Sequence, residues 1–254
     1  MKKHDIIFGP VNSRRLGRSL GIDPIMRNIC CQDCIYCEAG KTEILTTKRD
    51  EYVAPDDIIS ALEEVLKDAP ELDYITFSGL GEPTLNSKIG DVIRYLKKNY
   101  PQYPVCVLSN GMLLGDPQVQ QDIAEADLVI PSLDGSNAEE FSLVNRPGNE
   151  IDFDTFIAGL TQFTHIFKGK IHLELFIVPG INDSDDSIAR FAEIISTMRL
   201  DKIQLNALDR PGTENNIVIS SAENAARFSS VLGAFAQVEF VGRIKQPSER
   251  TDKL

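Results

Sequence analysis

Residues 74–84 read YITFSGLGEPT, a short apolar run that ends in a polar, glycine-rich turn. The run is typical of a strand covered on both faces, and the turn marks where that strand ends. Residues 104–110, PVCVLSN, repeat the arrangement, and a helical pattern at residues 87–99 lies between the two runs. A strand, a helix and a second strand in this order indicate a βαβ unit with parallel strands.

The same alternation extends in both directions along the chain. The clearest helix follows Pro55, a residue suited to a first helical turn, and carries Ile58, Ile59, Leu62, Val65 and Leu66 on one face. Further strands are predicted at residues 19–25, 127–134, 171–178 and 202–208, and further helices at about 117–126, 153–167, 185–198 and 221–235.

Six β/α units predict an α/β fold, either a doubly wound open sheet or a parallel-stranded partial (β/α)6 TIM-like barrel. We expect the partial barrel, in a single domain. Residues 1–18 are interpreted as an N-terminal basic segment and residues 19–215 as the core domain. Residues 216–254 are expected to complete the core with a helix, a possible short strand and a tail.

Polar motifs follow four of the predicted strands. In both candidate folds the carboxyl ends of parallel strands meet at one edge of the sheet, where active sites gather. Turn chemistry explains any one motif, but four at one edge indicate a site. The motifs are GLGEPT at residues 79–84, SNG at 109–111, SLDG at 132–135 and PGIND at 179–183.

The composition limits the partners. The chain has 26 Lys and Arg against 38 Asp and Glu, a net charge of −12 that disfavours broad contact with nucleic acid or anionic membranes. A local excess of 5 − 1 = +4 exists within residues 1–18. No apolar run is long enough for a membrane span or a signal peptide, so a cytoplasmic protein without a membrane partner is expected.

Four of the five cysteines lie within residues 29–37, ICCQDCIYC. Disulfides are disfavoured in a reducing compartment, so metal binding is the better interpretation. The spacing is C-x3-C-x2-C if Cys30 is a ligand and C-x2-C-x2-C if Cys31 is. Structural zinc needs a second ligand pair, which the chain lacks, and a ferredoxin-type cluster needs a fourth cysteine. Three ligands leave one iron of a cubane cluster open, which indicates chemistry rather than structure.

The arrangement C-x3-C-x-Φ-C, with Tyr36 as the aromatic residue, resembles the motif of radical S-adenosylmethionine (radical SAM) enzymes. The resemblance implies that Cys30, Cys34 and Cys37 hold a [4Fe-4S] cluster whose fourth iron binds SAM. Cys31 is then outside the ligand set, and Tyr36 lies near the adenine of SAM.

The later motifs fit the same family in order. GLGEPT resembles the GGE motif, which implies that Leu80, Gly81 and Glu82 lie at the methionyl amine, although Leu80 stands where the family has glycine. The remaining SAM contacts, to carboxylate and ribose, are implied at Ser109, Asn110, Ser132 and Asp134.

The resemblance extends over residues 6–215 to a group similar to the wyosine-type tRNA-modifying synthases. It rests on GPVNSRRLGRSLGID at residues 9–23, NRPG at 145–148, VPGIND at 178–183 and QLNALDRPGTE at 204–214. It implies reductive cleavage of SAM to a 5′-deoxyadenosyl radical, an electron donor such as flavodoxin or ferredoxin, and anaerobic chemistry.

The substrate is predicted from the polar residues near the expected mouth of the barrel. Arginine matches carboxylate and phosphate groups, so an anionic or hydrogen-bond-rich substrate is expected. A small molecule is favoured over tRNA because of the acidic charge and because wyosine-type synthases carry additional cysteines that this chain lacks before Cys30. A tRNA-modifying enzyme and a non-enzymatic iron–sulfur redox or sensor protein are the alternatives. The candidate substrate residues are Arg14, Arg15, Arg146, Asn206 and Arg210.

Overall fold

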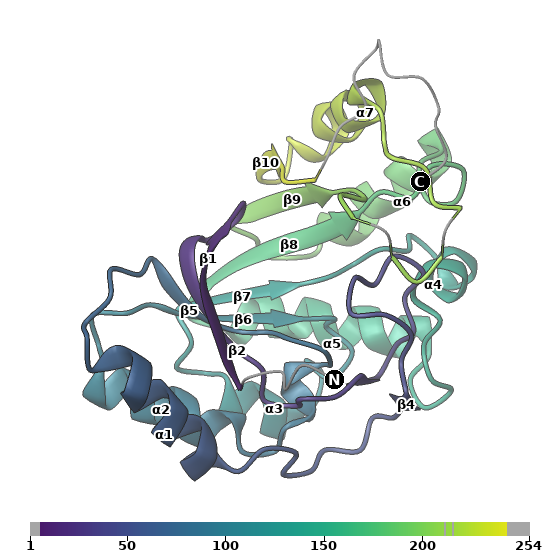
Figure 1. Ribbon diagram of the computed structural model, residues 1–254. Coiled ribbons are helices and arrows are strands. Elements are labelled where there is room, and N and C mark those ends of the chain that lie inside the picture. The colour runs from purple at the N-terminus through teal and green to yellow at the C-terminus, as the bar shows by residue number, and fades with distance from the viewer. Residues whose placement is uncertain (1–5, 211, 215, 243–254) are drawn as a thin grey trace.

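A computed structural model of the chain describes residues 6–210, 212–214 and 216–242, so Lys2, Lys3 and the predicted C-terminal tail lie outside the described residues. Its main element is an eight-stranded sheet in the order β1-β2-β5-β6-β7-β8-β9-β10 (Figure 1). All six predicted strands are confirmed. They are β2 (Gly17–Ile22), β5 (Tyr74–Phe77), β6 (Val105–Ser109), β7 (Leu128–Pro131), β8 (Lys170–Phe176) and β9 (Lys202–Asn206).

The predicted helices are also present. Pro55 occupies the first turn of its helix, and the Ser184 side chain caps a later one by accepting a 3.0 Å hydrogen bond from the Ser187 N–H, as helix start signals predict. The helices are α1 (Pro55–Leu66), α2 (Ile89–Asn99), α3 (Pro117–Asp122), α5 (Phe153–Ile166), α6 (Asp185–Ile195) and α7 (Ala222–Leu232).

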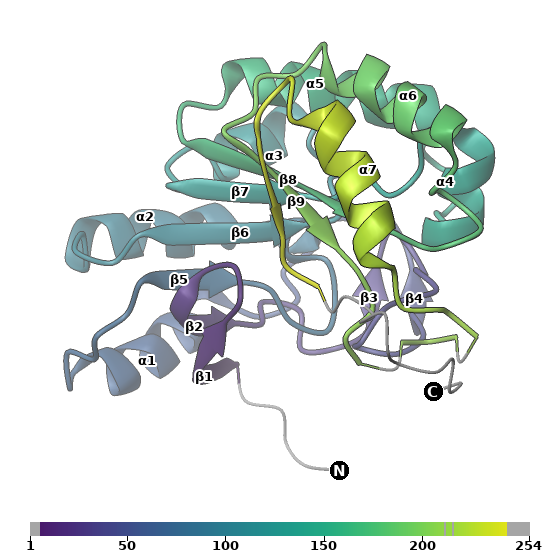
Figure 2. The same ribbon diagram turned by 90° about the horizontal axis from the view of Figure 1, so that it is seen from above.

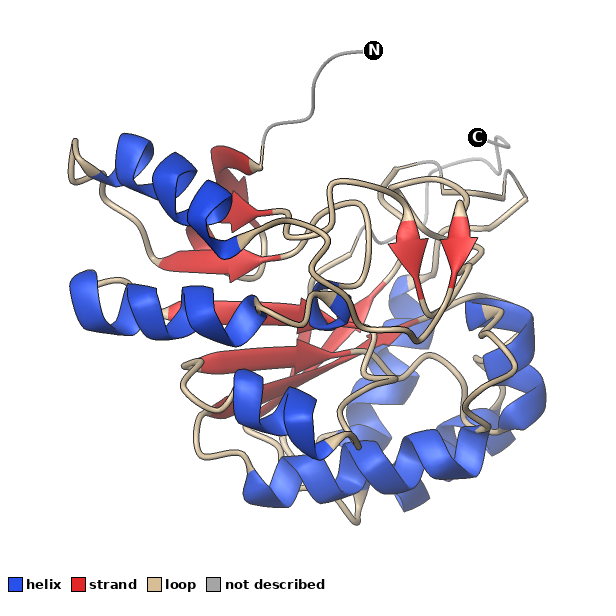
Figure 3. Cartoon of the chain, turned by 90° about the horizontal axis from the view of Figure 1, so that it is seen from below, coloured by secondary structure: helices blue, strands red, loops and turns tan. Residues whose placement is uncertain are grey.

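The strand order decides between the two predicted folds. From β2 onward, neighbouring strands are parallel and follow one another in chain order, with no reversal. A doubly wound sheet would reverse direction at a switch point. The helices instead form an arc outside the curved sheet, seen from above and below in Figures 2 and 3. The partial barrel is therefore confirmed.

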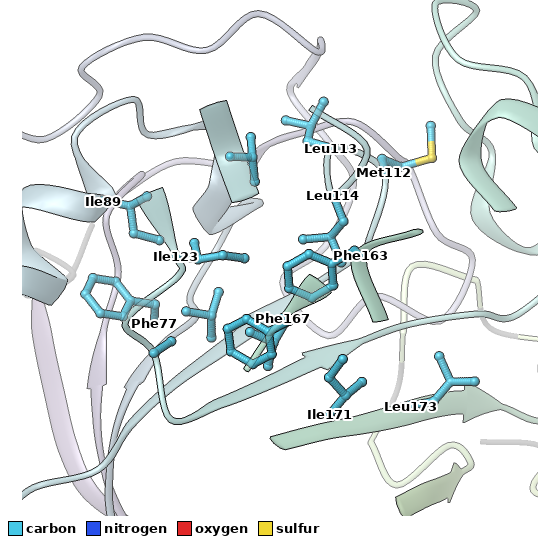
Figure 4. Packing of buried hydrophobic residues seen from close by; sticks show 14 of the residues in the cluster. Phe77, Ile89, Met112, Leu113, Leu114, Ile123, Phe163, Phe167, Ile171 and Leu173 are labelled. Carbon is cyan, nitrogen blue, oxygen red and sulfur yellow. The ribbon is translucent and has the colours of Figure 1, made fainter. Parts of the chain in front are cut away.

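The main hydrophobic core lies between the sheet and these helices. Alternate strand residues such as Ile171, Leu173 and Ile203 join one buried cluster with Phe163 and Phe167 of the helical layer (Figure 4). Because side chains alternate along a strand, the residues between them face the concave side of the sheet. The concave face is thus free to carry polar groups.

Several elements were not predicted. β1 (Ile7–Ser13) pairs antiparallel with β2, and the boundary drawn after residue 18 falls inside β2. Gly9 and Pro10 interrupt the β1 pattern, and a register shift between Phe8 and Val11 accommodates them. The other unpredicted elements are α4 (Ala138–Asn145), β3 (Ile29–Cys30) and β4 (Ile44–Leu45), whereas β10 (Gln237–Phe240) is the short strand expected near the C-terminus.

Among the described residues, the structure contains no helix whose length and apolar character would let it cross a membrane.

Candidate functional site at the carboxyl edge of the sheet

The cysteine loop follows β2 in the chain and begins with β3. It lies over the carboxyl edge of the sheet. Cys31 is 0% exposed and belongs to the main hydrophobic core. Cys30, Cys34 and Cys37 are only partly buried and lie outside that core. The structure therefore separates Cys31 from the other three cysteines, whose spacing is C-x3-C-x2-C; their role as ligands stays a prediction.

The three remaining thiols share a poorly hydrated environment. Burial raises the pKa of Cys30 to about 12 and also raises the pKa of Cys34 and Cys37; the Glu82 carboxylate adds to the shift at Cys30, and the Cys30 sulfur adds to the shift at Cys34. These thiols are therefore protonated at neutral pH unless a cation draws the proton away. Among the described residues, no three His, Cys, Asp or Glu side chains lie close enough to bind a single metal ion. In a cubane cluster each thiolate binds a different iron.

Two asparagine amides contact the sulfur atoms. Asn110 Nδ2 donates to Cys30 Sγ at 3.4 Å, and Asn145 Nδ2 donates to Cys34 Sγ at 3.4 Å. Hydrogen bonds to sulfur are one of the levers that tune an iron–sulfur centre. The donor set of three thiols, with amide donors beside two of them, fits a cluster bound by three cysteines.

Glu82 is the first of two buried carboxylates beside the cysteines, at 2% exposure. Its Oε1 accepts from Thr84 N (3.0 Å), Thr84 Oγ1 (2.6 Å) and Ser109 Oγ (2.8 Å), and its Oε2 accepts from Asn110 N (2.7 Å). Burial raises its pKa, and these hydrogen bonds oppose the shift. We call Glu82, Thr84, Ser109 and Asn110 the Glu82 network; it joins the ends of β5 and β6.

Asp134 is the second buried carboxylate, at 1% exposure. Its Oδ2 accepts from Tyr36 Oη (2.5 Å) and Asn145 Nδ2 (2.8 Å), and its Oδ1 accepts from Phe176 N (2.8 Å). Burial raises its pKa against the effect of these donors. We call Asp134, Tyr36, Asn145 and Phe176 the Asp134 network; it joins the cysteine loop to α4 and to the end of β8.

The Tyr36 ring is held from two sides. It stacks on Phe176 with ring centroids 3.8 Å apart and an interplanar angle of 5°, while its hydroxyl bonds Asp134. The backbone of Gly212 lies against Tyr36, since a Cβ on Gly212 would meet the Tyr36 carbonyl carbon at 2.6 Å. The predicted contact of Tyr36 with adenine stays a prediction.

The GLGEPT turn is compatible with Leu80 at the family's glycine position. The positive φ of 135° falls on Gly79, and the Leu80 N–H donates to Asp23 Oδ2 at 3.0 Å. Gly81 is the residue that must lack a side chain, because a Cβ there would lie 2.3 Å from the Ile29 carbonyl oxygen. This close approach brings the turn onto the cysteine loop, and the Glu82 N–H donates to that same oxygen at 3.1 Å.

The predicted substrate residues do not gather at one point. Arg146 pairs with Glu214 at 2.7 Å and Arg210 with Glu38 at 3.7 Å, both beside the cysteine loop. Arg14 pairs with Asp209 at 3.3 Å and is half exposed. Asn206 lies on β9 in register with Phe176. Arg15 pairs with Glu174, a β8 residue on the concave face.

Three residues that contribute to this edge were missed by the sequence analysis. Asn145 and Phe176 complete the Asp134 network. The third residue, Asn182, belongs to the PGIND motif. Its Nδ2 donates to the carbonyls of Asp134 and Phe176 at 2.7 Å each, and its Oδ1 accepts from Val178 N. The motif positions of Asn145 and Asn182, in NRPG and PGIND, were the available signal.

The family model of the radical SAM superfamily matches residues 25–192, more than half of the chain, including the cysteine loop and both carboxylate networks. The chain belongs to the radical SAM superfamily. The superfamily prediction is confirmed, whereas the wyosine-type assignment within it remains a prediction.

Two relatives of this radical SAM chain cover most of its length. A UPF0026 protein of Methanocaldococcus jannaschii is 34% identical over 242 residues, 94% of this chain and 73% of that protein. A protein of Brachyspira hyodysenteriae named GTPase Obg is 43% identical over 199 residues, 78% of this chain. The chain spans only 29% of the Brachyspira protein.

Solved structures agree on the radical SAM fold. A radical SAM methyltransferase from Sphaerobacter thermophilus superposes with a TM-score of 0.65 at 19% identity, covering 87% of this chain and 66% of that one. TYW1 with a lysine-pyruvate adduct superposes with a TM-score of 0.59 at 17% identity, covering 86% and 74%. The protein anSMEcpe with bound AdoMet superposes with a TM-score of 0.61 at 18% identity, covering 87% and 63%.

Proposed function

We propose that this radical SAM protein is an enzyme that binds a [4Fe-4S] cluster through Cys30, Cys34 and Cys37 and cleaves SAM reductively to act on a small-molecule substrate. The observation that carries the proposal is the separation of the cysteines. Cys31 is buried in the apolar core, while the other three occupy the carboxyl edge together with amide donors to sulfur. Three thiolates on a cubane cluster leave one iron for the amino and carboxylate groups of SAM.

When bound, the reduced cluster supplies one electron that breaks the C5′–S bond of SAM, giving methionine and a 5′-deoxyadenosyl radical that takes a hydrogen atom from the substrate. The electron comes from a donor of the flavodoxin or ferredoxin type. The protein's own part is to hold these groups in place and to exclude water from them.

The residues at the edge suit that part. The Glu82 network fixes the turn that lies against the cysteine loop, and the Asp134 network fixes Tyr36 within the loop. Both carboxylates already accept hydrogen bonds on both oxygens, so they support the backbone around the site. The backbone of Leu80 and Gly81, with the side chains of Ser109, Asn110 and Ser132, remains our proposal for the groups that touch SAM.

A small-molecule substrate is favoured over tRNA by the net charge of −12 and by the pairing of the exposed arginines. Each arginine at the mouth has a carboxylate partner, so a phosphate backbone would have to displace that partner.

The experiment is an anaerobic assay for 5′-deoxyadenosine with the reconstituted protein, SAM and dithionite. Cys34→Ser is expected to abolish both the iron–sulfur absorbance and 5′-deoxyadenosine, while Cys31→Ala, the matched control on the same loop, retains both. Cluster binding without SAM cleavage would overturn the proposal in favour of a redox or sensor protein. Loss of the cluster in Cys31→Ala but not in Cys30→Ser would overturn the ligand assignment.

A further inference from the structure

A polar layer lies on the concave face of the sheet, just inside the cofactor site. Arg15 leaves the turn between β1 and β2 and pairs with Glu174 on β8, although three strands separate β2 from β8 in the sheet. Such a contact is possible only because the sheet curves around its concave face. Gln204 on β9 lies in register with Glu174 and faces the same way.

The layer is placed next to the cofactor residues. Ser132, at the end of β7, forms an isolated bridge with Glu174. Phe176 of the Asp134 network lies two residues further along β8, a separation of roughly 7 Å along a strand. Below the layer, Leu16, Cys106, Leu128 and Ile130 form a separate buried apolar cluster. The layer therefore lies between an apolar cluster and the residues that we propose touch SAM.

Two atoms of the layer lack partners. Gln204 is 0% exposed, and its Nε2 donates to Glu239 at 2.6 Å, but its Oε1 is buried with no hydrogen-bond partner among the described residues. His172 lies two residues before Glu174 on β8, and its Nδ1 is also buried with no hydrogen-bond partner in the described part of the chain. A buried acceptor without a donor costs about 1–3 kcal/mol, so these atoms indicate a polar ligand.

The pair formed by Arg15 and Glu174 also has unused capacity. Among the described residues, Arg15 donates from its side chain only to Glu174, through one of its five N–H groups. Arg15 donates to Oε2 of Glu174. The other carboxylate oxygen, Oε1, accepts no hydrogen bond from a described side chain. The layer therefore offers donors at Arg15 and acceptors at Glu174 and Gln204.

We infer that Arg15, Glu174 and Gln204 form the substrate site of the proposed radical SAM reaction and that the substrate is a compact zwitterion of the amino-acid class. Its carboxylate binds the free N–H groups of Arg15, and its ammonium binds Glu174 Oε1 and Gln204 Oε1. The charges of Arg15 and Glu174 cancel, so a zwitterion adds no unpaired charge, whereas an anion or a cation alone would leave one. That the bound zwitterion is the substrate rests on the proposed function, whereas the binding of the zwitterion does not.

The test is calorimetric titration of the cluster-loaded protein, with SAM present, against pools of the common L-amino acids. At least one pool is expected to bind. The amide and the deaminated acid of the best ligand should each bind at least about tenfold more weakly, because each lacks one of the two charged groups.

Variants assign the residues. Arg15→Gln is expected to weaken binding by roughly ten- to a hundredfold, and Glu174→Gln by a similar factor. Gln204→Leu, which leaves the ion pair intact, should weaken binding by a smaller factor. Arg18→Gln is the matched control, because Arg18 lies on the same hairpin and is exposed; its affinity should be unchanged.

Cluster absorbance and 5′-deoxyadenosine formation without amino acid, measured for every variant, show whether the cofactor site has survived. If no pool binds, or if the amide and deaminated acid bind as well as the parent, or if a folded Arg15→Gln binds normally, the inference is overturned. A protein that cleaves SAM but binds no amino acid refutes this inference alone. A protein that binds an amino acid but cannot cleave SAM refutes the proposed function instead.

Discussion

The Glu82 and Asp134 networks are alike in composition and position. Each centres on a buried carboxylate at the end of a strand, and each includes an asparagine whose amide donates to a cysteine sulfur at 3.4 Å. Asn110 connects Glu82 to Cys30, and Asn145 connects Asp134 to Cys34. The two networks therefore contact the cysteine loop at two of its sulfur atoms.

The networks differ in how far apart their members lie along the chain. The partners of Glu82 are 2, 27 and 28 residues away, at the ends of two adjacent β/α units. The partners of Asp134 are 11, 42 and 98 residues away, on a helix, another strand and the cysteine loop. The first network follows from pairing neighbouring strands, whereas the second exists only when three distant segments come together.

The largest expected effect comes from removing the carboxylates. Asp134→Ala leaves the Phe176 N–H and the Tyr36 hydroxyl buried without an acceptor and removes the shortest hydrogen bond of the Asn145 amide, so it should lower the free energy of unfolding by about 3–5 kcal/mol. Glu82→Ala leaves the backbone N–H groups of Thr84 and Asn110 without this acceptor and should lower it by about 2–3 kcal/mol, a smaller loss because the hydroxyls of Thr84 and Ser109 can rotate toward other acceptors. Urea unfolding of the two variants measures the difference.

Asp68→Ala, at an exposed position after α1, is the control and should change stability by less than about 0.5 kcal/mol. Equal losses for Asp134→Ala and Glu82→Ala would show that rotation of the Thr84 and Ser109 hydroxyls does not relieve the loss of the Glu82 carboxylate.

A smaller effect is expected from single hydroxyls. Tyr36→Phe keeps the stacking on Phe176 but removes the bond to Asp134, and should cost about 1–2 kcal/mol. Thr84→Val removes one of several donors to Glu82 and should cost about 0.5–1.5 kcal/mol. The same unfolding measurement applies. If Tyr36→Phe were as stable as the parent protein, the phenol would not hold the loop to Asp134.

The smallest effect concerns the sulfur contacts. An N–H donated to a cluster sulfur stabilises the reduced, more negative state, so its removal should lower the reduction potential. Asn110→Ala and Asn145→Ala are each expected to lower it by roughly tens of millivolts, equivalent to about 1 kcal/mol for one electron. Potentiometric titration of the reconstituted variants measures this. An upward shift in either variant would contradict the role of that amide.

Much of the edge was accessible from local sequence pattern. YITFSGLGEPT and PVCVLSN identified two strands and the residues that follow them, and the strand ends then met because parallel strands in a barrel share one edge. The Glu82 network is the direct product of these two motifs. The cysteine spacing likewise indicated an iron site with an open position.

The sequence by itself therefore determined the order of the β/α units, the edge at which polar motifs gather and the superfamily of the protein. Only the tertiary structure decided that Cys31 belongs to the core, that Asn145 and Phe176 complete a network with Asp134, and that Arg15 meets Glu174 across the concave face. The physical reason is the distance along the chain over which each kind of interaction acts. Periodicity and turn chemistry act over a few residues, whereas burial and long-range hydrogen bonds depend on how far the sheet curves and on which segments it brings together.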